Sequence, residues 1–279
     1  MLLSIVFTPD SALLGTTSGL PAAGSCDGLG SLSLWCHSNA LPGGALTARS
    51  LSICVLVVAM SGYRPRWTCI PQWYVTFSVG SSIFTELGVD SAAKAMTLLL
   101  IPICLGDRRV WQWQRPADPV SPGWRGAAFA SHLVIRLQVF IIYATAVVSK
   151  LTDSSWQHGV AMYFVANDPT YGFPPSLRAL LDPLLSTYWL VAALSWSVVA
   201  IQGVIAVTII GTRRMRLIAL CCSTALHLAI GVLMSLPTFS LAMIGLVLAA
   251  YGGCLVDHHG GQRSDAGGLA GAHRTSLAH

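Results

Sequence analysis

Charged residues are scarce in this 279-residue chain. Asp, Glu, Lys and Arg together make up 10% of it, whereas soluble domains carry about 25%. Hydrophobic residues make up 54%, and several apolar runs approach the roughly 20 residues that span a bilayer. The composition therefore excludes a soluble enzyme, a nucleic-acid-binding protein and a disordered protein.

Sequence motifs for metal binding are also missing. The eight cysteines form no C-x-x-C pair, and no histidine cluster has the spacing of metal ligands, so we expect no metal site. Cys26 and Cys36 lie in a Gly- and Ser-rich stretch and would pair only if that stretch faces an oxidising compartment, which the residues leave open. No Asp or Glu lies in the middle of an apolar run, which disfavours a carboxylate-based proton pump or cation transporter.

Seven apolar segments predict an all-α, polytopic α-helical membrane protein. They cover residues 46–61, 73–85, 92–105, 127–149, 187–210, 217–236 and 239–255. The second and third segments are short, and a re-entrant hairpin is the alternative to two full crossings. We therefore expect an irregular segment over residues 1–44, a transmembrane domain over 45–255 and a disordered polar tail over 256–279.

The basic residues predict how the chain is oriented. Arginines gather in the loop after the first span, in the loop 106–125 and in the turn 211–216, and the intervening loops are acidic or neutral. No Lys or Arg precedes Arg49. Because basic loops stay in the cytoplasm, the N-terminal segment is expected outside and the C-terminus in the cytoplasm.

Polar residues inside the predicted spans are candidates for function. Arg136, Tyr143 and Lys150 follow one another at seven-residue intervals and so share one helix face. An Arg at this depth costs roughly 2.5–3.5 kcal/mol and needs a partner. His227 lies at a similar depth in the sixth span. Two interpretations remain for this helix face and for His227. They are either packing contacts between helices or parts of a functional pocket, with His227 as a proton-transfer group.

The stretch after the fourth span is rich in aromatic residues, including Trp156, Tyr163 and Phe164. It is either an aromatic belt at the membrane surface or a lid over the face that carries Arg136, Tyr143 and Lys150.

Two longer stretches carry a family resemblance. Residues 136–164 resemble the signature of the horizontally transferred transmembrane (HTTM) domain, related to vitamin K-dependent gamma-carboxylase, and 223–245 resemble its later His helix. Residues 61–82, 98–113 and 167–174 are similar to the sporulation-delaying protein B subgroup. Members of that subgroup begin with a further membrane helix, and residues 1–7 of this chain resemble the end of that helix. The matching positions are Arg136, Gln138, Tyr143, Lys150, Trp156, Gly159, His227, Phe239 and Ser240.

The resemblance implies a bacterial, multi-pass protein of the cell (inner) membrane that takes part in maturation or export of a secreted toxin-like peptide. Its partners would be the lipid bilayer, a precursor peptide and a small accessory protein. By analogy with the carboxylase, Lys150 would be a base and His227 its proton partner, beside a pocket of Arg136, Gln138, Tyr143, Trp156 and Gly159, with a reduced quinone as a cofactor. The alternatives are a quinone-dependent membrane enzyme and a non-catalytic immunity or scaffold protein.

Overall fold

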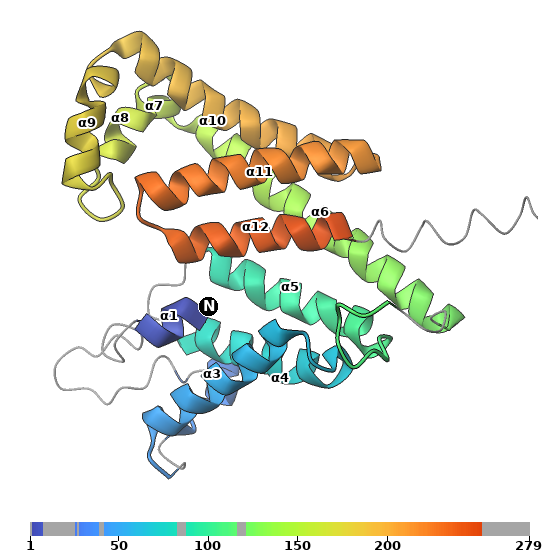
Figure 1. Cartoon of the computed structure of the whole chain (residues 1–279). Helices are drawn as coiled ribbons and strands as arrows, with labels where there is room; N and C mark the ends of the chain where they lie inside the picture. Colours follow the sequence, from blue (N-terminus) through green and yellow to red (C-terminus); the bar gives the residue numbers. More distant parts are fainter. Residues whose placement is uncertain are drawn as a thin grey trace, which may run out of the picture.

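The computed structural model describes residues 2–7, 26, 28–38, 42–82, 88–115 and 121–252. Over these residues the chain forms helices joined by turns, with no strand, in agreement with the predicted all-α class (Figure 1). The predicted tail 256–279 and much of the segment 1–44 lie outside the described residues.

Each of the seven predicted apolar segments falls mainly on one helix over the residues that the structure describes. Three of these helices, α6, α10 and α11, are long and apolar enough to cross a membrane, while α3 and α12 are shorter apolar helices. The elements are α1 (Leu2–Phe7), η1 (Gly28–Leu32), α3 (Ala45–Ser61), α4 (Pro65–Ser82), α5 (Gly88–Leu105), α6 (Pro122–Thr152), α7 (Ser154–Gln157), α8 (Ala161–Ala166), α9 (Pro175–Leu185), α10 (Tyr188–Ile209), α11 (Arg213–Leu233) and α12 (Pro237–Gly252).

The helices extend beyond the apolar segments from which they were predicted. Helix α4 begins at Pro65 rather than near residue 73, and α6 begins at Pro122 inside the predicted loop. The arginines expected in a turn before the sixth span instead form the first turn of α11. Hydropathy alone misses such turns, because basic side chains can extend their charged ends to water from a helix terminus. The stretch 150–186, expected as a loop, contains α7, α8 and α9.

A small hydrophobic cluster around Ala166, Phe173 and Leu185 packs α8 and α9, and two main cores hold the rest of the described bundle together. The larger is shared by α5, α6, α10, α11 and α12, and the smaller by α1, α3, α4 and the residues after η1. Figure 1 shows α11 and α12 running side by side with α6 crossing behind them. Fully buried members of the larger core are Ile135, Val139, Tyr143, Ile205, Ile209, Ala219, Val247 and Ala250.

The bundle has two chemically different ends. What we call the basic end consists of the α3–α4 turn, the loop 106–115 and the α10–α11 turn, on the right in Figure 1. The opposite end, which we call the disulfide end, carries α7–α9 and the residues that follow η1. There Cys26 and Cys36 are joined by a disulfide bond, the pairing that the sequence left open.

Candidate functional site

A buried polar cluster joins α6 to α11. The hydroxyl of Tyr143 lies 2.8 Å from Nε2 of His227 and 2.9 Å from Oγ of Ser223, within hydrogen-bond distance of both. The exposed fractions of Tyr143, Ser223 and His227 are 1%, 0% and 2%. The structure therefore brings together two of the predicted site residues, Tyr143 and His227.

The helical repeat explains why these side chains meet. Four-residue steps along α6 bury Ile135, Val139 and Tyr143 on one face. Ser223 lies one turn before His227 on α11, so both face the same neighbour. The cluster is thus built by two rigid helices and not by loops.

Helix α12 closes the cluster from a third side. The ring of His227 makes edge contacts with the rings of Tyr143 and Phe239, whose centroids lie 6.1 Å and 5.6 Å from its own. A Cβ added to Gly231 of α11 would lie 3.0 Å from Oγ of Ser240. The absence of a side chain at Gly231 therefore lets the start of α12 pack close beside His227.

Two buried polar atoms at this site lack a hydrogen-bond partner within the described residues, Nδ1 of His227 and Oγ of Ser240. Such an atom costs about 1–3 kcal/mol when it stays unpaired, so a polar group that reached either atom would stabilise the site. If Tyr143 donates to Nε2, then Nδ1 carries the ring proton and can donate it; in the other tautomer Nδ1 is an acceptor. The cluster can therefore hold or transfer a proton.

Lys150 and Trp156 form a separate pair near the end of α6. Nζ of Lys150 lies 5.1 Å from the centroid of the Trp156 ring, a cation–π contact, and donates to the Ala146 carbonyl at 3.5 Å. Lys150 lies about 10 Å along the helix from Tyr143. Among the interactions of the described residues, no hydrogen bond joins Lys150 to His227. Their roles as base and proton partner stay a prediction.

Gly159 is the contact point between the short helices and α10. Its φ is 72°, and a Cβ added to it would lie 2.8 Å from that of Ala192. Oγ of Ser195 donates to the Gly159 carbonyl at 3.1 Å and accepts from the Met162 N–H at 3.1 Å. Sequence reasoning missed Ser195, for which the only signal was a hydroxyl residue inside an apolar helix.

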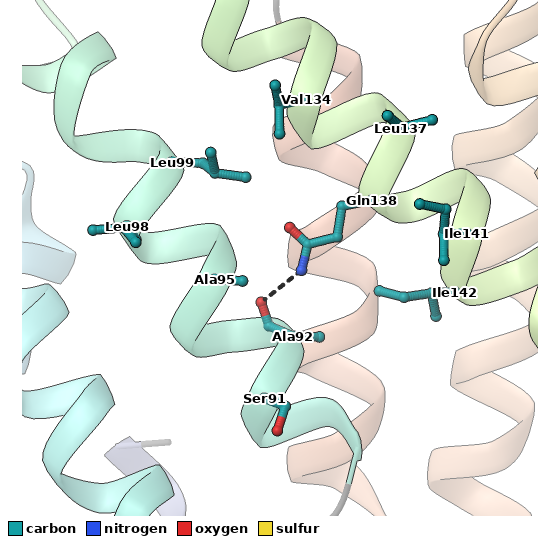
Figure 2. Close-up of a pocket in the computed structure, with 10 residues that line it drawn as sticks. All are labelled: Ser91, Ala92, Ala95, Leu98, Leu99, Val134, Leu137, Gln138, Ile141 and Ile142. Carbon is teal, nitrogen blue, oxygen red and sulfur yellow. Dashed lines mark hydrogen bonds between the residues drawn. The ribbon is translucent and has the colours of Figure 1, made fainter. Parts of the chain in front are cut away.

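Arg136 and Gln138 extend in different directions from α6. Nε of Arg136 donates to the Ala250 carbonyl of α12 at 3.3 Å. The Gln138 amide donates to the Ala92 carbonyl of α5 at 3.4 Å and lines an open groove between α5 and α6, about 580 Å³ in volume (Figure 2). Apart from Gln138 and Ser91, the groove is lined by apolar side chains. The seven predicted site residues thus lie in several environments and not in one pocket.

Comparison with known proteins shows two relatives in Bacillus subtilis (strain 168). The chain is 31% identical over 248 residues to the uncharacterized protein YitO, with 88% of this chain and 79% of YitO covered. It is 30% identical over 201 residues to the sporulation-delaying protein SdpB. The matched region covers 72% of this chain but only 62% of SdpB. No protein-family model and no solved structure matches the chain.

Proposed function

We propose that this chain, which belongs to the SdpB-like family that includes YitO, is a multi-pass bacterial membrane protein. In this proposal it takes part in maturing or exporting a secreted toxin-like peptide. The apolar helices and the homology to SdpB support a membrane protein of this type. The seven crossings, the wider relation to the HTTM domain and the peptide substrate are parts of the proposal.

Two observations support the proposed orientation, with the disulfide end outside the cell and the C-terminus in the cytoplasm. Disulfides persist in oxidising compartments, and one joins Cys26 to Cys36. Arginines gather at the opposite end, as expected of loops that stay in the cytoplasm.

The buried, unpaired Nδ1 of His227 is the observation that carries a role in peptide maturation. In the proposal, a polar group of the precursor peptide reaches this atom, and Tyr143 fixes the ring through its hydrogen bond to Nε2. Lys150 lies where α6 ends and α7 begins, between the cluster and the outer surface, and serves as the base. A small accessory protein would present the precursor.

The test is mass spectrometry of secreted peptides from cells that produce the wild-type chain, His227→Ala or Lys150→Ala. Cultures are matched for the amount of the protein in the membrane. We expect a peptide that is present with the wild type to disappear or to change in mass with both variants. A change in mass would identify the chemical step, and a loss of the mature form alone would indicate export.

Two neighbouring substitutions serve as controls. Leu228→Ala removes an exposed side chain beside His227, and Thr152→Ala removes a hydroxyl that donates only to carbonyls of α6. Both should leave the peptides unchanged. If His227→Ala and Lys150→Ala also leave them unchanged, the proposal fails and a non-catalytic immunity or scaffold protein becomes the better explanation.

The groove between α5 and α6 supports a second candidate, a membrane enzyme that uses a reduced quinone. Its volume and apolar lining suit a lipid-soluble ring, and the Gln138 amide could hydrogen-bond to a ring oxygen. Such a cofactor would supply redox chemistry. Peptide production that depends on quinone in proteoliposomes, and is lost in Gln138→Leu, would favour this candidate; a product formed without quinone would count against it.

A further inference from the structure

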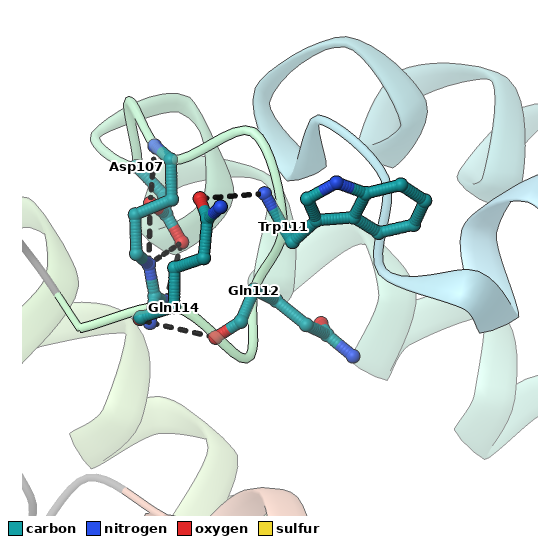
Figure 3. Close-up of polar contacts among 5 residues, drawn as sticks. Asp107, Trp111, Gln112 and Gln114 are labelled. Carbon is teal, nitrogen blue, oxygen red and sulfur yellow. Dashed lines mark hydrogen bonds and ion pairs between the residues drawn. The ribbon is translucent and has the colours of Figure 1, made fainter.

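Arg109 organises the loop 106–115 at the basic end. Its guanidinium donates to both carboxylate oxygens of Asp107, the shortest contact being 2.6 Å, and to the carbonyls of Gln112 and Gln114 at 2.7 Å and 2.8 Å. Burial alone would raise the pKa of Asp107, but the hydrogen bonds and charge of Arg109 outweigh it and place the pKa below the ordinary 3.8. The pair therefore stays charged at neutral pH, and Asp107 neutralises the charge of Arg109 within the loop (Figure 3).

The same loop is fixed against the α3–α4 turn. The Arg64 N–H donates to the Val110 carbonyl at 2.7 Å, and the Gln112 N–H donates to the Gly62 carbonyl at 2.9 Å. The indole of Trp113 donates to the Ser61 carbonyl at 3.1 Å. These contacts join two segments that are far apart in sequence into one surface.

This surface displays unpaired cations beside aromatic rings. Arg64, Arg66 and Arg108 are exposed, and within the described part of the chain their guanidinium groups form no ion pair. Trp67 and Trp113 are 70% and 75% exposed, and the Arg66 guanidinium lies 6.0 Å from the Trp67 ring centroid. We call these five residues the loop patch.

We propose that the loop patch is a binding site for the phosphate headgroups of anionic phospholipids. Guanidinium groups bind phosphate through paired hydrogen bonds, and tryptophan rings concentrate at the headgroup level of a bilayer. Trp67 lies in the first turn of α4 and Trp113 in the attached loop, so both rings flank the arginines at one end of the bundle. Charge complementarity and these exposed rings favour a lipid surface over an acidic peptide.

The experiment compares the full chain in nanodiscs of phosphatidylglycerol and of phosphatidylcholine, with native mass spectrometry counting the lipids that stay bound. In the test variant, Arg66→Gln is combined with Arg108→Gln. The matched control combines Arg213→Gln with Arg214→Gln, which removes the same charge from exposed positions at the same end. At about a factor of 5 for each arginine, we expect about 25-fold weaker phosphatidylglycerol binding in the test variant only.

Several outcomes would overturn the site. Equal losses in the two variants would show a diffuse charge effect, and no loss in the test variant would show that the patch does not bind. Arg66→Lys with Arg108→Lys, which keeps the charge, should retain part of the binding if the test variant is folded. The binding of inorganic phosphate or polyglutamate is also measured in phosphatidylcholine discs. If either binds the wild type and not the test variant, the ligand of the loop patch would be free phosphate or an acidic peptide and not a lipid.

Discussion

A single hydroxyl links α6 to α11. The Tyr143 hydroxyl reaches both Ser223 and His227, and all three side chains are almost fully buried. In a bilayer the neighbouring lipid offers no replacement hydrogen bond, although such bonds between helices are worth only about 0.6–2 kcal/mol. The cluster therefore fixes the orientation of the His227 ring and contributes only modestly to the free energy of unfolding.

We predict that Tyr143→Phe lowers the free energy of unfolding by about 1–2 kcal/mol, because two buried polar groups lose their shared partner. The measurement is thermal or denaturant unfolding of the purified protein in detergent. Tyr163→Phe is the matched control, since the Tyr163 side chain is 47% exposed, and it should leave stability unchanged. Equal effects of the two substitutions would mean that the hydrogen bonds of Tyr143 do not contribute.

At the scale of elements, the packing of α8 on α10 depends on one glycine. Gly159 has a left-handed φ of 72°, and its carbonyl accepts from Ser195 at the closest approach to α10. A residue with a side chain is strained at this φ wherever it is placed. Here the neighbouring backbone of Ala192, 3.0 Å from an added Cβ, adds a steric clash that no rotation relieves.

Gly159→Ala should therefore detach the short helices from α10 and destabilise the protein by more than about 1 kcal/mol. Trypsin cleavage after Arg178, which is exposed on α9, should become faster. Gly203→Ala on α10 is the control, because a Cβ added there meets nothing within 4 Å and alanine favours a helix. Similar cleavage rates in the two variants would contradict a positioning role for Gly159.

The sequence predicted the elements better than the contacts between them. Apolar runs located the long helices because a helix buried in lipid must be apolar, but the first turns of α4 and α11 were missed because their charged residues lie outside those runs. The meeting of Tyr143 with His227 depends on how α6 and α11 pack, which periodicity on each helix alone does not determine. Ser195 lacked any distinctive spacing, so only the structure shows its role.

At the scale of the whole molecule, the two ends differ in chemistry. The disulfide of Cys26 and Cys36 lies at one end, and exposed arginines such as Arg108 and Arg214 lie at the other. An oxidising compartment on one side and the reducing cytoplasm on the other would match these ends. The proposed site near His227 and the loop patch would then face opposite sides of the membrane.

We predict that Cys26 and Cys36 react with a membrane-impermeant maleimide in intact cells only after an impermeant reductant is added, because they are bonded and outside. The experiment uses a variant in which the other six of the eight cysteines are replaced by alanine, and labelling is read by a mass shift on a gel. A cysteine placed by Arg214→Cys in that background should react only after the membrane is permeabilised. Labelling of Cys26 and Cys36 without reduction, or only after permeabilisation, would contradict this orientation and with it the outward position of Lys150.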